Sequence, residues 1–407
     1  MNVIDKLLNN ITMYKLVNYG LFLLAGISLI LSFLRIVPFS PLELIVHFLV
    51  ITVTCYVGNL LLAKLFKATI NSESSSITAA ILFFLLWPSL EWQTLLLTVF
   101  ASIVAMASKF ILAYKKKHIF NPAAVGAVAL VIFNSGALWW IATASMLPFT
   151  LVLGLLVVRK IRRFGMFLTF LTVTLSSFLI QTQLRNLNLI EEAIQFFVSF
   201  PVIFFGTIML TEPLTTPPTR RLQMIYASLL GILFSWQGAF PIILTTELVL
   251  IFGNVFSFLV SPKYRLFLKL EQVNTLAFNT FEFVFQKPQN FKFKAGQYLE
   301  WTLPMGRTDS RGNRRYFTIA SAPTEDKIRL GVRFNDPSSS FKKFLREVKK
   351  GAIIAAGQLI GDFTLPENKS KKLVFIAGGI GITPFRSMIG QFVDVGEKRD
   401  IVLFYSN

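Results

Sequence analysis

Long apolar runs joined by short polar connections fill the first 262 residues of the chain and restrict the folds open to it. About 20 apolar residues form a helix that crosses the roughly 30 Å hydrocarbon core of a bilayer. Ten apolar runs are present, and most of them approach this length: 17–37, 42–66, 77–90, 93–114, 121–134, 137–158, 164–183, 192–210, 222–240 and 242–260. We therefore expect residues 1–262 to form a polytopic α-helical membrane domain of about ten segments.

The basic residues of this part predict its orientation. If the N-terminus is cytoplasmic, the inner connections include the basic stretches 115–117 and 159–163, whereas the outer connections hold Arg35 and Arg185. Basic residues are enriched on the cytoplasmic side of membrane proteins. The pattern predicts a multi-pass protein of the cell membrane with both termini in the cytoplasm. Anionic lipid headgroups then account for the net charge of +19, and no nucleic-acid partner is expected.

The cysteine and histidine counts exclude several redox centres. Cys55 is the single cysteine, so a cysteine-ligated iron–sulfur cluster, which needs about four cysteines, is excluded, as is a disulfide within the chain. His118 follows three lysines in a basic connection, and His47 is the other histidine. Haem ligation by this pair is not expected, which disfavours a haem-based ferric reductase. We expect no metal site.

Two of the apolar runs are short. Runs 77–90 and 121–134 would span only ~21 Å as straight helices, and polar residues precede both. Short segments of this kind can be half-helices whose N-termini point at a site near the bilayer midplane. Two tilted helices would explain the pattern equally well.

Two motifs in this region resemble one membrane family. Phe120–Gly126 (FNPAAVG) and Gly206–Thr215 (GTIMLTEPLT) are similar, in this order, to motifs of the D subunit of Rnf electron-transport complexes and of the related B subunit of sodium-translocating NADH:quinone reductases. The likeness covers most of residues 60–240 and implies a flavin or ion pathway. Glu212 stands where the family has aspartate. Such a carboxylate can bind a cation or relay a proton, or it can belong to a capped turn.

One feature of that family is missing. The family attaches flavin mononucleotide to a threonine of a Ser/Thr-Gly-Ala-Thr sequence in a long loop. The nearest match here is Asn134–Leu138 (NSGAL), where Leu138 has no hydroxyl to form the ester and the long loop is absent. We therefore expect no covalent flavin, and noncovalent flavin mononucleotide, riboflavin or quinone is left as the alternative.

After about residue 263, charged residues become frequent and short strand-like runs replace the apolar segments. The runs 266–273, 280–285, 296–303 and 328–334 are typical of a small antiparallel barrel. Arg314–Pro323 (RRYFTIASAP) is a two-faced strand closed by a proline turn. Its aromatic, hydroxyl and guanidinium groups are those that a flavin nucleotide requires, although an ordinary half-buried strand can carry them as well.

Three motifs in this part resemble the ferredoxin reductase family. They are Phe293–Tyr298, Arg314–Pro323 and Phe375–Pro384, in the order that the family has them. The resemblance implies an FAD-binding barrel at 263–368 and the start of an NAD(P)-binding α/β domain at 369–407. It implies FAD as cofactor and NAD(P)H as electron donor. A complete nucleotide-binding domain needs on the order of a hundred further residues, so we expect the chain to be part of a longer protein.

The resemblance also implies site residues. Arg315 and the helix start at Ser339 would share the FAD pyrophosphate, Phe317 would stack on the isoalloxazine, and Thr318 would face its reactive edge. Thr318 and Thr383 are the expected catalytic residues. The expected cofactor-binding residues are Arg315, Tyr316, Phe317, Thr318, Ile319, Ser321, Arg333, Ser339, Ser340, Lys342, Gly378, Gly379, Gly381, Thr383 and Pro384.

These features together predict a membrane flavoenzyme. Electrons would pass from NAD(P)H through FAD to a membrane flavin, a quinone or a partner subunit. The alternative is an ion or solute transporter whose soluble part is a flavin-binding regulatory domain. The sequence leaves the choice between NADH and NADPH, the ion coupling and the oligomeric state open.

Overall fold

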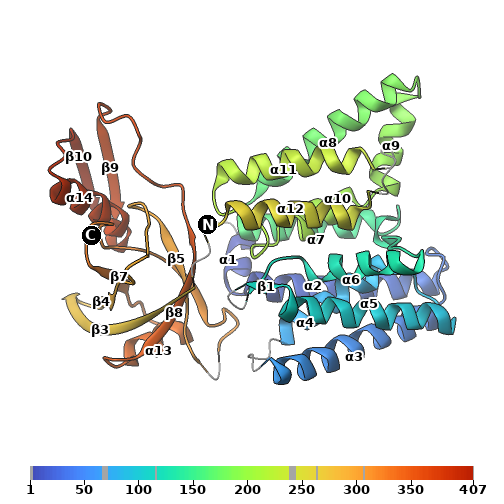
Figure 1. Cartoon of the computed structure of the whole chain (residues 1–407), viewed down its shortest axis with the longest axis horizontal. Helices are drawn as coiled ribbons and strands as arrows, with labels where there is room; N and C mark the ends of the chain where they lie inside the picture. Colours follow the sequence, from blue (N-terminus) through green and yellow to red (C-terminus); the bar gives the residue numbers. More distant parts are fainter. Residues whose placement is uncertain are drawn as a thin grey trace. The chain divides into compact units, whose positions relative to one another are not determined.

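The computed structural model describes residues 3–66, 72–114, 117–237, 244–262, 265–305 and 308–406. The chain forms two compact units, Met1–Ser261 and Pro262–Asn407, and their division lies next to the boundary expected at residue 262. The first unit consists mainly of helices and the second mainly of strands (Figure 1). The basic residues 67, 115, 116 and 263, which contributed to the expected topology, lie outside the described residues.

Each of the ten expected apolar runs contains a helix. The helices of the N-terminal unit are α1 (Val3–Asn9), α2 (Met13–Phe33), α3 (Pro41–Leu65), α4 (Ser72–Leu85), α5 (Trp92–Ile111), α6 (Pro122–Val128), α7 (Leu147–Ile161), α8 (Phe164–Leu184), α9 (Leu189–Ser199), α10 (Val202–Phe204), α11 (Arg220–Ser235) and α12 (Thr246–Val260). Irregular turns at Ala129–Phe133, Trp140–Ala142 and Phe205–Met209 interrupt them, the last with π-helical geometry. A two-stranded pair, β1 (Ala113–Tyr114) and β2 (Lys117–His118), joins α5 to α6.

Few of these helices have the length and hydropathy of a membrane span. Within the described residues, four do: α2, α3, α5 and α8. Helix α9 and the segment Val202–Met209 add a fifth if this pair, bent by 61°, counts as one span. The structure is therefore compatible with membrane association, and the expectation of about ten spans stays a prediction.

The two short runs form helices in the interior of the unit. The last eight residues of helix α4, from Thr78 to Leu85, are all buried, so its C-terminal half has no exposed face. Helix α6 begins at Asn121, whose side-chain oxygen accepts the backbone N–H of Ala124 at 3.2 Å. The run 121–134 was expected to be one helix, but α6 passes into the 3₁₀ turn and ends where Asn134 adopts φ 52°. Left-handed backbone of this kind stops a helix.

The C-terminal unit is built on an antiparallel sheet. Its strands are β3 (Arg265–Ala277), β4 (Thr280–Gln286), β5 (Tyr298–Thr302), β6 (Arg314–Thr318), β7 (Lys327–Arg333) and β8 (Ile353–Ile360), in the order β6-β5-β8-β3-β4-β7. A hydrogen bond of 2.8 Å from the Ala320 N–H to the Arg329 carbonyl joins the end of β6 to β7, which closes the sheet into a barrel. Fully buried Leu268, Phe285 and Leu299 lie in its core. The expected antiparallel barrel is present.

Two further layers accompany the barrel. Helix α13 (Ser340–Glu347) follows β7, and Phe341 and Leu345 bury its apolar side in the barrel core. Strands β9 (Leu373–Gly378) and β10 (Ile401–Ser406) pair in parallel, and α14 (Thr383–Val395) connects them. This is the expected beginning of an α/β domain, because parallel strands need such a crossover.

Candidate functional site

Strand β6 presents two of the expected site residues on one face. It pairs antiparallel with β5, so Arg315 lies opposite Trp301 and Phe317 lies opposite Leu299. Side chains alternate along a strand, and Arg315 and Phe317 are half-buried on the side that faces α13. The expected two-faced strand is therefore present over Arg314–Thr318, although it ends four residues before the expected turn at Ala322 and Pro323.

Phe341 of α13 connects these two residues. Its ring lies 5.3 Å from the guanidinium carbon of Arg315 and 5.8 Å from the ring of Phe317. Cation–π and tilted aromatic contacts at these distances are favourable, so they hold both side chains in place. Nothing in the sequence distinguishes Phe341 from any other apolar core residue.

The start of α13 is the second part of the site. Ser339 caps the helix, since its hydroxyl accepts the backbone N–H of Lys342 at 3.3 Å. The Lys342 ammonium donates to the carbonyl oxygen of Arg333 at 2.5 Å. Burial and the nearby guanidinium groups of Arg311 and Arg315 lower the pKa of Lys342. Three cations thus gather where helix N–H groups also favour negative charge, and this combination suits a phosphate.

Asp309 lies between the helix start and Arg315. Its Oδ2 accepts the backbone N–H of Ser340 at 3.0 Å, and the Ser340 hydroxyl accepts the backbone N–H of Asp309 at 3.0 Å. Its Oδ1 lies 3.9 Å from Nη2 of Arg315. Burial tends to raise the pKa of Asp309, but the N–H groups of Ser340 and Arg311 outweigh burial and lower it. Asp309 is therefore an anion in contact with both groups expected to share the pyrophosphate.

The guanidinium of Arg315 is also held by the loop before β6. Its Nη1 donates to the carbonyl oxygens of Arg311, Gly312 and Arg314 at 2.6, 3.2 and 2.5 Å. Among the described residues, its buried Nη2 has no hydrogen-bond partner. One side of the guanidinium is therefore saturated, while the other still has a donor to offer.

Other expected residues of this strand lie elsewhere. Tyr316 is on the opposite face, where its hydroxyl lies within hydrogen-bond distance of two acceptors, Glu300 at 2.9 Å and Gln358 at 3.1 Å. Ile319 is fully buried in the barrel core. The Ser321 hydroxyl accepts the backbone N–H of Arg329 at 3.2 Å. The structure therefore does not bring these three side chains to Phe317, and Ser321 and Ile319 support the strand end.

The expected nicotinamide residues gather beside β7. Gly379 has φ 50°, and a Cβ built on it would lie 3.3 Å from Nη1 of Arg333. A Cβ built on Gly331 of β7 would meet Cγ2 of Thr383 at 2.9 Å, so Thr383 packs against this strand. Pro384 occupies the first turn of α14, where its missing N–H is not needed. The glycine turn thus leads from β9 directly to the barrel.

Thr318 lies at the end of β6, opposite Tyr298 of β5. Thr383 donates its hydroxyl proton to the carbonyl oxygen of Ile380 at 3.2 Å. Gly378 and Gly381 have open space where a Cβ would be, so backbone there is accessible to a ligand. The two expected catalytic residues thus come from different segments: Thr318 lies on β6, and Thr383 packs against β7.

Helix α14 is bonded to the segment that follows β6. Arg386 donates to the carbonyl oxygen of Ala320 at 2.8 Å and pairs with Glu325, and the Ser387 hydroxyl donates to the carbonyl oxygen of Ser321 at 2.6 Å. Glu325 also pairs with Arg329 of β7 at 2.7 Å. Nothing in the sequence signals this network, because Arg386 and Ser387 lie 61 to 66 positions from their partners and share no local pattern with them.

The helical unit contains a separate polar cluster around Glu212. Its carboxylate accepts hydrogen bonds of 3.0 Å from the side chains of Asn121 and Thr215, and Nε2 of His118 lies 3.5 Å away. Asn254 accepts the backbone N–H of Asn121 at 2.7 Å. Among the described residues, the fully buried Tyr226 hydroxyl has no hydrogen-bond partner. The two motifs of the Rnf resemblance therefore meet at one place.

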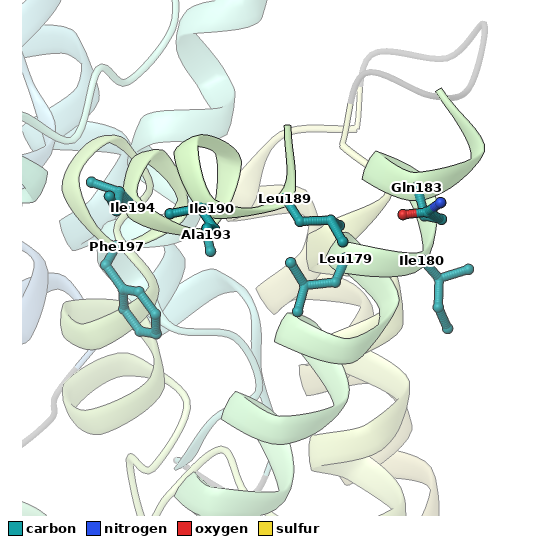
Figure 2. A pocket seen from close by; sticks show the side chains of 8 residues that line it. All are labelled: Leu179, Ile180, Gln183, Leu189, Ile190, Ala193, Ile194 and Phe197. Carbon is teal, nitrogen blue, oxygen red and sulfur yellow. The ribbon is translucent and has the colours of Figure 1, made fainter. Parts of the chain in front are cut away.

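The structure also shows an apolar groove between α8 and α9, with a volume of about 660 Å³ (Figure 2). Its lining residues are Leu179, Ile180, Gln183, Leu189, Ile190, Ala193, Ile194 and Phe197. Gln183 is the single polar side chain among them. The groove suits hydrocarbon and offers no charge to a phosphate or a carboxylate.

Comparison with known proteins gave matches for the C-terminal part of the chain, and no family model matches. A flavohemoprotein of Halalkalibacterium halodurans is 28% identical over 130 residues, which are 30% of this chain and 31% of that protein. An NAD(P)H-flavin reductase of Aliivibrio fischeri is 29% identical over 144 residues, which are 34% of this chain and 58% of that protein. The solved Amycolatopsis cytochrome P450 reductase is 26% identical, with a TM-score of 0.32 over 36% of this chain and 44% of that protein.

These relatives agree with the expected class of the C-terminal part, a flavin-dependent NAD(P)H oxidoreductase. The chain spans about a third of the length of the flavohemoprotein and just over half of the flavin reductase. The matches concern the ferredoxin reductase-like part, so the resemblance of residues 60–240 to the Rnf subunit stays a prediction.

Proposed function

We propose that the chain is a membrane-bound oxidoreductase that takes electrons from NAD(P)H onto FAD and delivers them to an acceptor in its helical unit. The acceptor is a noncovalently bound flavin or a quinone. The observation that carries this proposal is the meeting of Arg315, Phe317 and the start of α13 around Phe341. The sequence likeness to flavohemoproteins and to an NAD(P)H-flavin reductase supports it.

In this proposal, the chain binds two parts of FAD, the pyrophosphate and the isoalloxazine ring. Nη2 of Arg315 and the N–H groups at the start of α13 hold the pyrophosphate, and Lys342 adds positive charge nearby. Phe317 offers an aromatic face to the isoalloxazine, and Thr318 offers a hydroxyl to its edge. FAD supplies hydride acceptance and release of single electrons. The task of these residues is to position the ring and to keep the phosphates neutralised.

The electron donor approaches through the glycine turn. The open backbone at Gly378 and Gly381 lets a dinucleotide come close to the start of α14, whose N–H groups favour phosphate. Thr383 packs against β7, so a nicotinamide at this turn would lie beside the barrel. The Arg386 and Ser387 contacts then fix the distance between donor and flavin.

The helical unit supports an acceptor site in the membrane. Glu212, His118 and Asn121 form a polar cluster inside a unit whose described residues include four helices of span length. Ionisable groups buried inside a membrane domain cost free energy, and they usually have a function. They can supply protons to a reduced quinone or flavin. We further propose the multi-pass topology with cytoplasmic termini, because the basic connections favour it.

A second candidate function is ion or solute transport, with the C-terminal unit as a flavin-binding regulator. The cluster around Glu212 favours it, because a buried carboxylate can also bind a transported cation or proton. The two candidates differ in a measurable property. An oxidoreductase consumes NAD(P)H with an acceptor present, whereas a regulated transporter moves its substrate without consuming NAD(P)H.

The test is the flavin content of the detergent-purified chain, followed by NADH and NADPH oxidation with a soluble quinone analogue. Acid precipitation should release about one FAD per chain, and chromatography should identify it. Additional riboflavin or flavin mononucleotide would place a second carrier in the helical unit. Folded protein without any flavin would contradict the oxidoreductase, and flux into vesicles without NAD(P)H oxidation would favour the transporter.

A further inference from the structure

The two groups expected to hold the FAD pyrophosphate share one partner in this structure. The backbone N–H of Ser340 donates to Oδ2 of Asp309 at 3.0 Å, and Nη2 of Arg315 lies 3.9 Å from Oδ1 of the same carboxylate. A carboxylate resembles a phosphate in charge and in having oxygens that accept from two donors at once. Asp309 therefore occupies the position in which the proposed function puts a phosphate.

A phosphate and Asp309 cannot both accept the Ser340 N–H. This group is a single donor at the N-terminus of α13, and Asp309 already accepts it. A phosphate brought beside a retained Asp309 carboxylate would face like-charge repulsion at short range. FAD binding through Arg315 and α13 thus requires Asp309 to leave.

The contacts of the polypeptide around Asp309, which precedes β6, allow Asp309 to leave. Asp309 itself is connected to α13 by the reciprocal pair of hydrogen bonds with Ser340. Closer to β6, Asn313 holds the same polypeptide to the barrel. Its carbonyl oxygen accepts the Leu303 N–H at 3.1 Å, and its side-chain amide donates to the Leu303 carbonyl oxygen at 3.0 Å. Breaking the Asp309–Ser340 pair therefore does not require the anchor at Leu303 to break.

We propose that Asp309 is a resident anion of the phosphate site, and that FAD binds by displacing it. The carboxylate neutralises Arg315 and caps α13 while the flavin is absent. Asp309 then lowers the affinity of the site for every ligand that carries the pyrophosphate and leaves the affinity for the flavin ring unchanged. This inference rests on the proposed function, because it concerns the same site.

The test measures binding to the full chain in detergent after removal of flavin. Isothermal titration with FAD, ADP and riboflavin separates the phosphate-bearing half of the cofactor from the ring. Asp309→Asn keeps the shape of the side chain and removes its charge, and Asp309→Ala is the second variant. Asp326→Asn is the matched control, because it removes the same charge from an exposed position of the same unit.

We expect Asp309→Asn to bind FAD and ADP about tenfold more tightly than the parent, the size of one charge-assisted hydrogen bond. Riboflavin should bind all proteins equally, and Asp326→Asn should match the parent. Binding of FAD by the variant alone would support the proposal in its strongest form.

Three results would overturn it. Unchanged or weaker FAD binding in Asp309→Asn would show that Asp309 supports the site. An equal gain for riboflavin would place the effect away from the phosphates. If folded parent and variants bind neither FAD nor riboflavin, the proposed function fails as well. That result is distinguishable, because in the first two cases the parent still binds flavin.

Discussion

Asn121 and Glu212 lie 91 positions apart in the chain and are joined by a hydrogen bond of 3.0 Å from the amide to the carboxylate. Asn121 also caps α6 through its side-chain oxygen, so one residue sets both a helix start and the position of the carboxylate. A local capped turn at Glu212 would not need this distant partner. The contact thus favours a site assembled from both motifs.

Removal of the Glu212 carboxylate should destabilise the helical unit. Glu212→Ala leaves the Asn121 amide and the Thr215 hydroxyl without their acceptor, which costs about 1–3 kcal/mol for buried groups. Glu212→Gln keeps an acceptor and should cost less. Thermal unfolding in detergent measures the difference, with Glu191→Ala at an exposed position as control. Equal unfolding temperatures for Glu212→Ala and the control would contradict the expected role.

Exchange of Arg315 for lysine should weaken FAD binding about tenfold to a hundredfold. Lysine keeps the charge but loses the fork geometry that binds phosphate and the flat contact with Phe341. Flavin fluorescence during titration measures the affinity. Arg314→Lys is the control, because Arg314 is the neighbouring arginine and points to the other face of β6, near Glu300. Equal losses in both variants would indicate a general charge effect.

The stability of the C-terminal unit should fall at acidic pH through Glu325. Burial tends to raise the pKa of Glu325, but Arg386, the Ala322 N–H and Arg329 outweigh burial and lower it. The folded pKa is thus below the unfolded value of about 4.3. The resulting stability is present above the unfolded pKa and is lost as pH falls through the folded pKa.

Urea unfolding followed between about pH 6 and pH 3 tests this. The free energy of unfolding should decline more steeply in the parent than in Glu325→Gln, whose amide does not titrate in this range. Glu367→Gln, at an exposed position of the same unit, should decline like the parent. Parallel curves for parent and Glu325→Gln would show that the network contributes no pH dependence.

Alanine at Gly379 should be costly, and alanine at Gly378 should be tolerated. Gly379 has φ 50°, which costs an L-residue roughly 1–2 kcal/mol, and its new Cβ would also crowd Arg333. Gly378 has ordinary extended backbone and open space around it. Chemical unfolding should give Gly379→Ala a free energy of unfolding about 1–2 kcal/mol lower than that of Gly378→Ala. Equal stability would show that the turn relaxes without cost.

Local patterns predicted much of the C-terminal unit. The runs 266–273, 280–285 and 328–334 correspond to β3, β4 and β7, because two-faced alternation and turn residues mark strands directly. Helix α13 begins at Ser340, as the serines and the following apolar period indicated. Arg315 and Phe317 were placed together for the same reason, since they lie two positions apart on one strand.

Other features depended on tertiary contacts. Asp309 meets Ser340 across 31 positions, and a polar loop residue gives no signal of such a partner. In the helical unit, each apolar run contains a helix, but its composition did not determine the length of that helix. The run 121–134 ends in a 3₁₀ turn and left-handed Asn134, and hydropathy alone does not distinguish these from α-helix.

The bonds from Arg386 and Ser387 to the carbonyls of Ala320 and Ser321 also govern how the C-terminal unit can be dissected. A fragment that stops at residue 368 keeps the barrel strands but removes the donors of both carbonyls and one partner of Glu325, Arg386. A chimaera that joins this barrel to the nucleotide-binding half of another protein would lose the same contacts, unless the segment 320–325 and α14 are kept from the same parent. The barrel and the α/β segment are therefore one module for protein engineering, although they belong to different layers.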